Sequence, residues 1–330
     1  MRLHWISSLV IAVTIAAAAQ PQTGNSGSVE RLDPGLDAIV PADGIVERVA
    51  GGFKWPEGPV WVHSGFLLFS EIPSAVIDKW TLDRKVSTYL GPAVFTARDS
   101  ASAGEPGTNG LTLDKQGRLT MCDQGNRRIA RLQTNGQFTV LADRYEGKRF
   151  NSPNDLVYKS DGSLYFTDPP YGLPKGDKDP KRELPFSGIF RIAGGKVTLL
   201  NKDLPNPNGI AFSPDEHFLY VDNSEPRRLF MRYEVRSDGT LGPGKVFYDL
   251  ASTSGLNNPD GMKVDQKGNV YAAGPGGIWI FSPEGKHLGT VKLPEIASNC
   301  AWGDADGKTL YITASTGLYR IHLKIPGLRP

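Results

Sequence analysis

The chain of 330 residues contains only two cysteines, and its charges nearly balance. Two cysteines exclude a disulfide-dense scaffold and a cysteine-rich zinc module. The 37 Lys and Arg residues and 35 Asp and Glu residues give a formal net charge of +2. A general nucleic-acid binder carries a strong basic excess, and an acidic disordered protein carries the opposite. The composition therefore argues against both classes.

Sequence motifs for several common chemistries are missing as well. No G-x-S-x-G segment is present, so a serine site of the α/β-hydrolase type has no support. Neither G-x-x-x-x-G-K-[ST] nor G-x-G-x-x-G occurs, so a nucleotide cofactor has no support either.

Long hydrophobic runs are scarce, and the one that stands out lies at the N-terminus. Residues 5–19 carry no charge and follow a short positive start, Met1-Arg2-Leu3-His4. A run of about 15 residues is shorter than the roughly 20 that span a bilayer. Ala17 and Ala19 fit the small-residue pattern of a signal-peptidase site. The sequence therefore predicts a signal peptide over residues 1–19, no membrane span, and a periplasmic or secreted protein.

We expect residues 20–43 to form a flexible spacer and residues 44–330 to form the catalytic domain. Export to an oxidising compartment leaves a disulfide between Cys122 and Cys300 open. They are far apart in the sequence, and we favour two buried free thiols.

The chain is rich in turn formers, with 38 Gly and 25 Pro, and a strand-rich unit recurs six times. Each unit begins with a polar residue, usually followed by Gly, and continues with β-rich stretches separated by Gly/Asp turns. The leading residues lie 39 to 54 residues apart; they are Glu57, Asn109, Asn154, Asn208, Asp260 and Asn299. Repeats of about this length with several strands each are typical of propeller blades. We therefore predict an all-β fold, a six-bladed β-propeller; a β-sandwich would not explain the shared polar start.

The two ends of the predicted domain both read as strands, at residues 45–49 and 317–323. We expect one of them to complete a blade that begins at the other end of the chain.

Equivalent positions in a propeller lie at one height around its axis, so the six leading side chains are predicted to form a ring. Two carboxylates and four amides suit a hard cation such as Ca²⁺, which prefers oxygen ligands. The ring is too poor in nitrogen and sulfur donors for a structural zinc site. The alternative is that each Asn-Gly or Asp-Gly pair only makes a turn. We favour a metal site because Glu57 is a poor turn residue.

Five segments resemble the senescence marker protein/gluconolactonase family, also called regucalcin-like, and in particular its bacterial secreted members. They are WPEGPVW at 55–61, NSPNDLVYKSDGSLYFTDPPYGL at 151–173, LPNPNGIAFSPDEHFLYV at 204–221, PDGMKVDQKGNVYAAGPGGIWIFSPEG at 259–285 and SNCAWGDADGKTLYIT at 298–313. Their shared order and spacing are more specific than any one motif. The resemblance independently implies a six-bladed propeller.

The resemblance also implies which residues hold one divalent cation. The matching positions are Glu57, Asn154, Asn208 and Asp260. We expect Ca²⁺, with Zn²⁺, Mn²⁺ or Mg²⁺ as alternatives. Asn109 is interpreted as a substrate-binding group or a support for the ligands, and Asn299 as structural.

Two features near the third repeat concern substrate choice. Animal members of the family place a sugar-contacting Arg where this chain has Ser152, and Arg149 is out of register with it. The run from Cys122 to Arg128 resembles bacterial members instead. Arg127 and Arg128 are either substrate contacts or solvated surface residues, and we favour the second interpretation.

The activity implied by the resemblance is hydrolysis of a lactone, with a sugar lactone such as gluconolactone as the expected small-molecule substrate. A cation would polarise the lactone carbonyl, and Asp260 is the predicted general base. A hydroxide formed on the cation is the rival base. Two alternatives stay open: a metal-dependent esterase or phosphotriesterase of the same fold, and a calcium-stabilised binding propeller without catalysis. The sequence does not indicate the oligomeric state.

Other residues are placed around this predicted site. Trp55, Tyr171 and Phe186 are predicted pocket walls. The long loops 95–108 and 169–185 are predicted to border the substrate path. Asp168 and Asp222 end strands, and we interpret both as turn caps rather than catalytic groups.

The predicted cleavage gives the first testable expectation. The exported protein should begin at Gln20, because the small residues at 17 and 19 precede it. N-terminal sequencing of protein recovered from outside the cytoplasm checks this. Recovery of exported protein that still begins at Met1 would contradict the cleavage site.

Overall fold

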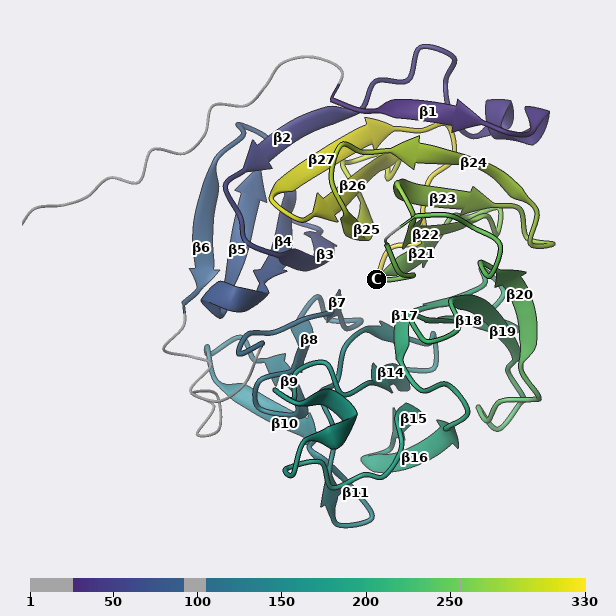
Figure 1. Ribbon diagram of the computed structural model, residues 1–330. Helices are drawn as coiled ribbons and strands as arrows, with labels where there is room; N and C mark the ends of the chain where they lie inside the picture. The colour runs from purple at the N-terminus through teal and green to yellow at the C-terminus, as the bar shows by residue number, and fades with distance from the viewer. Residues whose placement is uncertain (1–25, 92–104, 256) are drawn as a thin grey trace, which may run out of the picture.

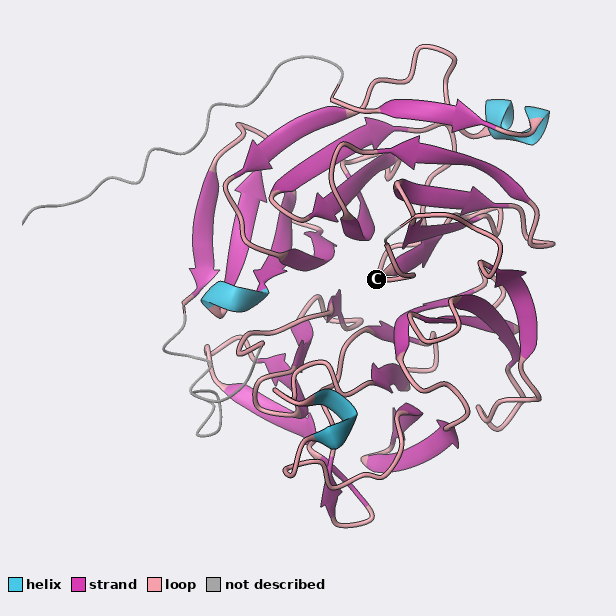
Figure 2. Cartoon of the chain, viewed as in Figure 1, coloured by secondary structure: helices cyan, strands magenta, loops and turns pink. Residues whose placement is uncertain are grey.

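The computed structural model describes residues 26–91, 105–255 and 257–330. The predicted signal peptide and most of the loop 95–108 lie outside these residues. Strands dominate the described chain (Figure 2), and they form six sheets arranged in a ring (Figure 1). The predicted six-bladed β-propeller is therefore confirmed.

Four blades are each built from four consecutive antiparallel strands. They comprise β3 Pro56–Val62, β4 Phe66–Glu71, β5 Val76–Thr81 and β6 Val86–Leu90; β7 Leu111–Leu113, β8 Leu119–Asp123, β9 Arg128–Leu132 and β10 Phe138–Ala142; β13 Leu156–Tyr158, β14 Leu164–Asp168, β15 Gly188–Ala193 and β16 Lys196–Asn201; β17 Pro207–Phe212, β18 Phe218–Asn223, β19 Leu229–Glu234 and β20 Lys245–Asp249. The short pair β11 Arg144–Tyr145 and β12 Lys148–Arg149 forms a separate hairpin.

The remaining two blades each take an outer strand from the N-terminal part of the chain. One consists of β21 Met262–Val264, β22 Val270–Gly274, β23 Gly277–Phe281 and β24 His287–Lys292, with β1 Ser28–Arg31 outermost; the other consists of β25 Ala297–Gly303, β26 Thr309–Ala314 and β27 Gly317–His322, with β2 Glu47–Gly51 outermost. In the ranges that the structure describes, three short 3-10 helices lie in connections: η1 Pro34–Ala38, η2 Ile72–Ser74 and η5 Gly176–Lys178.

The ring is closed by pairing between the two ends of the domain. Strand β2 pairs antiparallel with β27, with Glu47 opposite Arg320 and Gly51 opposite Gly317. The predicted closure is thus confirmed. Because β2 leads directly into the first blade, this pairing fixes the first blade against the last.

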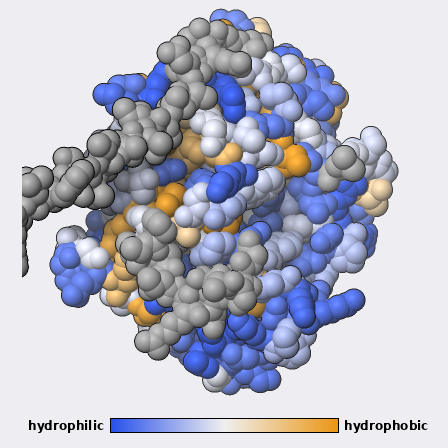
Figure 3. Space-filling view, turned by 60° about the vertical axis from the view of Figure 1, so that its left-hand side comes forward, coloured by the Kyte–Doolittle hydropathy of each residue, from blue (hydrophilic) through white to orange (hydrophobic). Residues whose placement is uncertain are grey.

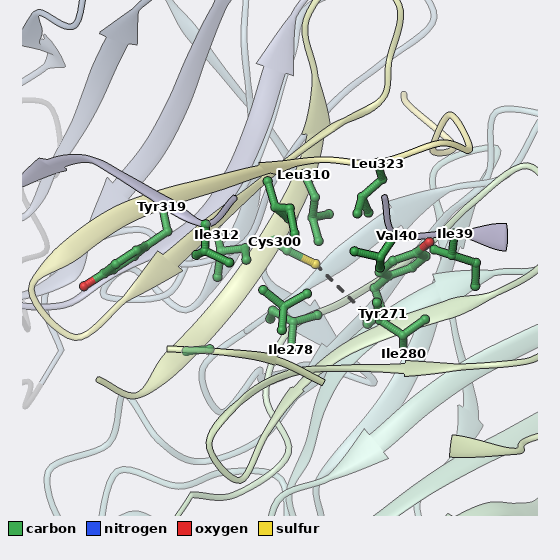
Figure 4. Close-up of a cluster of buried hydrophobic side chains, with 14 of the residues drawn as sticks. Ile39, Val40, Tyr271, Ile278, Ile280, Cys300, Leu310, Ile312, Tyr319 and Leu323 are labelled. Atoms are coloured by element: carbon green, nitrogen blue, oxygen red, sulfur yellow. Dashed lines mark hydrogen bonds between the residues drawn. The ribbon is translucent and has the colours of Figure 1, made fainter. Parts of the chain in front are cut away.

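One predicted boundary is wrong. The predicted flexible spacer covers residues 20–43, but in its described part, from residue 26, β1 pairs with β24 and η1 packs beside it. Leu36 is fully buried, and Ile39 and Val40 pack in one apolar cluster with Tyr271 and Leu323 (Figure 4). These apolar side chains lack a strand or helix periodicity, yet their burial orders the segment on the propeller.

The six inner strands form a closed circle around the axis. β3, β7, β13, β17, β21 and β25 each contact the next, and β25 contacts β3. The hydrophobic core lies between neighbouring blades as several clusters. Cys122 and Cys300 are buried in different clusters as free thiols, which confirms that prediction.

The surface seen in Figure 3 is mainly hydrophilic, with scattered apolar side chains. Within the described ranges, no helix has the length and apolar character needed to cross a bilayer.

Ring closure predicts that the C-terminal strand is essential. A chain lacking residues 317–330 loses β27, which lies between β2 and β26, together with the buried Leu318, Tyr319 and Ile321. We expect no soluble folded protein, because two sheet edges and the apolar core of that blade are exposed. Solubility and circular dichroism check this, and a chain beginning at residue 26 is the control. A soluble truncated chain with a cooperative thermal transition would contradict the prediction.

Candidate active site

A cavity of about 290 Å³ lies at one mouth of the central channel, and five of the six predicted ring residues line it. They are Glu57, Asn109, Asn154, Asn208 and Asp260. Trp55 and Tyr171, two of the three predicted pocket walls, also line the cavity. Phe186, the third, instead packs against the apolar cluster of the third blade. A second cavity, of about 230 Å³, is mostly apolar and includes the opposite ends of the inner strands.

Glu57 is held in place from two sides. It is buried on β3, where its Oε2 accepts hydrogen bonds from its neighbour Gly58 N at 2.5 Å and from Asn299 Nδ2 at 3.0 Å. Asn299 therefore does not line the cavity but fixes the direction of the Glu57 carboxylate.

The two predicted amide ligands differ in their partners. Asn208 Nδ2 donates to Ser224 Oγ at 3.3 Å, and Ser224 Oγ donates in turn to Pro259 O at 2.8 Å. The Asn208 side chain also lies beside Asp260, where it lowers that carboxyl's pKa. The side-chain amide of Asn154 has no hydrogen-bond partner among the described residues, although only 4% of the residue is exposed. Its oxygen is therefore available to an occupant of the cavity.

The glycines that follow the ring residues are required by close packing, and three of the four do not make left-handed turns. Only Gly58 has a positive φ, of 52°. A Cβ on Gly261 would lie 1.9 Å from Asn299 Cγ, and one on Gly209 would lie 2.7 Å from Asp222 Oδ2. Close packing, and not a left-handed conformation, therefore accounts for the glycines at 110, 209 and 261. The glycines make room for side chains that the neighbouring blades direct at the axis.

Further charges lie at the axis beside the ring residues. Asp155 and Asp222 are buried, and neither oxygen of Asp222 accepts a well-aligned hydrogen bond, although the nearby backbone N–H of Gly209 lowers its pKa. The interpretation of Asp222 as a turn cap is therefore wrong. Lys263 Nζ lies 3.6 Å from Asp155 Oδ2 and donates to Asn299 Oδ1 at 3.3 Å and Met262 O at 2.9 Å. This ammonium group partly compensates the negative charge on the axis.

Asp168 behaves as predicted. Its two oxygens accept hydrogen bonds from the backbone N–H groups of Asn151 at 2.7 Å and Ser152 at 2.8 Å. This cap holds the start of the segment that carries Asn154 to the axis.

The residues of the predicted substrate-choice region are structural. Ser152 Oγ donates to Pro169 O at 2.6 Å and accepts from Gly172 N at 2.9 Å, which fixes the turn that carries Tyr171. Arg127 is buried, and its Nε donates to Phe150 O at 2.6 Å, so its assignment to the solvated surface is wrong. Arg128 forms an ion pair with Asp123, 2.6 Å between Nε and Oδ2. The partners of these three side chains are backbone groups and a carboxylate of the protein itself.

Two polar residues at the cavity were not singled out from the sequence. Glu105 lines it, and the fully buried Gln124 connects Glu105 to Asn109. The signals that pointed toward them were the long loop into the second blade and the 122–128 run, but neither indicated that they meet.

The comparisons with known proteins agree with this geometry. The model of the "SMP-30/Gluconolactonase/LRE-like region" matches residues 55–316. The chain belongs to this family. It is 39% identical to a gluconolactonase of Zymomonas mobilis, over 98% of this chain and 95% of the relative. It is 28% identical to a pentonolactonase of Haloferax volcanii, over 63% of this chain and 67% of that one.

A solved structure of a gluconolactonase from Xanthomonas campestris superposes with a TM-score of 0.81 and 31% identity, covering 94% of this chain and 99% of that one. The region matched to the SMP-30/gluconolactonase family contains all six predicted ring residues. It also contains Glu105 and Gln124, so the whole described cavity belongs to the family domain.

Burial controls the ionisation of this family member's axial carboxylates. Burial, followed by the nearby Asp155, raises the pKa of Glu57 to about 7, against opposing hydrogen bonds from Asn299 and Gly58. Burial also raises the pKa of Asp222 well above its usual range, with Asp155 adding to the effect. The pKa of Asp260 is raised by burial first, and then by the charges of Glu57 and Asp222.

These directions predict how stability depends on pH in a chelator. A carboxyl whose pKa is higher in the folded state retains its proton when the unfolded chain has lost it, so stability falls as pH rises from about 4.5 to about 7. The rise for Glu57 alone corresponds to about 3 kcal/mol. We expect a lower melting temperature at about pH 8 than at about pH 5.

Thermal unfolding with EDTA at both pH values measures this effect. Glu57→Gln should flatten the pH dependence, because the buried group no longer ionises, whereas Lys263→Met should steepen it by removing the compensating ammonium. Equal pH slopes in the wild-type protein and both variants would show that the axial carboxylates do not control stability.

Proposed function

We propose that the protein hydrolyses a lactone to the corresponding hydroxy acid, and that its substrate is a sugar lactone such as gluconolactone. The observation that carries the proposal is the convergence of Glu57, Asn154, Asn208 and Asp260 on one polar cavity at the mouth of the channel. Gluconolactonase and pentonolactonase relatives support lactone hydrolysis. The polar lining favours a hydroxylated substrate over an apolar ester.

We further propose that these four residues hold one divalent cation, with Ca²⁺ expected. Two carboxylates and two amide oxygens form a set of hard donors. No group of three or more His, Cys, Asp or Glu in the described ranges is arranged to hold a metal, so any site here depends on the amides. The unpartnered Asn154 amide and the excess of buried negative charge fit a cation. A bound divalent cation would polarise the lactone carbonyl and stabilise negative charge on its oxygen.

Asp260 is the proposed general base. It lines the cavity and is partly exposed to it, so water can reach its carboxylate. Burial and the charges of Glu57 and Asp222 raise the pKa of Asp260, whereas a divalent cation held beside it would lower that pKa. Asp260 would take a proton from water as the water oxygen forms a bond to the carbonyl carbon. The ring C–O bond then breaks, and the released alkoxide takes up the proton held by Asp260 to give the hydroxy acid.

Trp55 and Tyr171 are proposed to border the substrate. Both line the cavity, and Tyr171 is carried on the turn that Ser152 fixes. Their rings offer apolar surface to the carbon skeleton, while the amides and carboxylates face its oxygens. We also propose that the protein acts outside the cytoplasm, on the strength of its N-terminal sequence.

Lactone hydrolysis by the metal-replete protein tests the proposal. Acid release from D-glucono-δ-lactone should be fast with Ca²⁺, abolished by EDTA and restored by added Ca²⁺. Asp260→Asn should lower kcat by about 10² to 10⁴, the range expected for loss of a general base. Exposed Asp238→Asn is the matched control.

The outcomes separate the alternatives. Calcium binding without opening of any lactone in a panel would favour a binding propeller. Turnover of aryl esters or phosphotriesters, with none of lactones, would favour the esterase alternative. Full activity of Asp260→Asn with metal bound would refute the assignment of the base.

A further inference from the structure

The cavity has a side wall away from the axial carboxylates, and Glu105 is its charged member. Glu105 is partly exposed and lines the cavity together with Trp55 and Ile72. It immediately precedes a segment that is tied to the second blade. Gly125 N donates to Gly107 O at 3.1 Å, and a Cβ on Gly125 would lie 2.1 Å from Pro106 O. The backbone next to Glu105 is therefore packed closely against the blade.

A buried glutamine sets the direction of the hydrogen bonds in this wall. Gln124 is fully buried; its Oε1 accepts from Asn109 Nδ2 at 2.9 Å, and its Nε2 donates to Glu105 Oε2. Packing limits its freedom, because a Cβ at Gly172 would lie 2.9 Å from Gln124 Cγ. Gln124 therefore uses its own donor and acceptor inside the wall, and it presents neither to the cavity.

This wall offers an occupant of the cavity two acceptor oxygens. Asn109 uses its amide N–H₂ on Gln124, which leaves its Oδ1 for the cavity. Glu105 Oε2 is bound to Gln124, and Oε1 has no hydrogen-bond partner among the described residues. An ionised carboxylate and an amide oxygen only accept hydrogen bonds. Such a wall recognises groups that donate, and the donors of a sugar lactone are its hydroxyl groups.

Glu105 is also electrically separate from the cation ligands. The pKa of Glu105 is raised by burial and lowered by Gln124, with no contribution from the ring carboxylates. By contrast, the charge of Glu57 raises the pKa of Asp260. Because Glu105 does not interact with Glu57 and Asp260, its carboxylate is free to bind substrate rather than metal.

We propose that Glu105 is the substrate-specificity residue of this site, that Gln124 positions it, and that its carboxylate accepts hydrogen bonds from the hydroxyl groups of a polyhydroxylated lactone. The proposal rests on the proposed function and narrows its substrate class. Hydrogen bonds to a charged group are stronger than neutral ones, so neutralising Glu105 should selectively weaken hydroxylated ligands.

The test compares ligands with and without hydroxyl groups, using Glu105→Gln. For hydrolysis, the pair is D-glucono-δ-lactone and δ-valerolactone. For binding, it is their stable amide counterparts, D-glucono-δ-lactam and 2-piperidone, measured by calorimetry on the calcium-loaded protein. Glu146→Gln, on the exposed hairpin between β11 and β12, is the matched control. Calcium affinity and melting temperature report whether the variant is folded.

We expect Glu105→Gln to lower kcat/KM for the gluconolactone and affinity for the hydroxylated lactam by about tenfold or more. For δ-valerolactone and 2-piperidone, kcat/KM and affinity of the variant should stay within about twofold of the wild-type values. These compounds have no hydroxyl group to donate to Glu105. Gln124→Leu should reproduce the selective loss in weaker form, because Glu105 loses its orienting donor.

The proposal would be overturned if Glu105→Gln lowered kcat/KM or affinity equally for the hydroxylated and the unsubstituted compound, or for neither. It would also be overturned if the wild-type protein did not bind D-glucono-δ-lactam more tightly than 2-piperidone. The lactam measurement stands apart from turnover. A wild-type chain that opens no lactone but binds the hydroxylated lactam through Glu105 would refute the proposed hydrolysis and retain the recognition.

Discussion

The enclosure of several carboxylates on one axis is the constraint on which the rest of this structure depends. Glu57, Asp155 and Asp222 are buried, Asp260 borders the cavity beside them, and Lys263 is the ammonium group that offsets them. Burying like charges together is costly, because each loses hydration and repels the others. A fold that assembles them must be held by other forces. Here those are the apolar clusters between blades and the pairing of β2 with β27.

The same constraint explains why polar-glycine pairs recur in the sequence. Six inner strands converge on the axis, so each ring residue is followed by backbone that a neighbouring side chain must pass. A Cβ on Gly110 would lie 2.6 Å from Asp155 Oδ1, and the contacts at Gly209 and Gly261 are similarly short. The glycines are thus part of the charged centre rather than of its loops. Any larger residue there would displace the groups that orient Glu57 and Asp260.

The sequence was sufficient to predict the blades and the ring, because both arise from a pattern repeated six times. The exposed outer strands were harder: β6 has exposed side chains at four of its five positions and shows no alternation. Strand β1 and Leu36 were missed because their burial depends on β24, which is more than 250 residues away in the chain. Gln124 was missed, and Asp222 was misinterpreted as a turn cap, for a related reason. Local sequence does not reveal which way a polar side chain points once blades pack.

The two sets of carboxylates differ in a way that assigns them different tasks. Those at the axis lie close enough to raise one another's pKa and are backed by Lys263 and Asn299, so their shared need is for positive charge. Glu105 lines the cavity with one buried amide as its partner and a second oxygen that has no hydrogen-bond partner among the described residues, so its need is for a hydrogen-bond donor. A hydroxylated lactone with its carbonyl toward the axis could direct its hydroxyl groups at the wall. Placing charge stabilisation and hydroxyl recognition on separate blades would allow substrate preference to change without disturbing the axial centre.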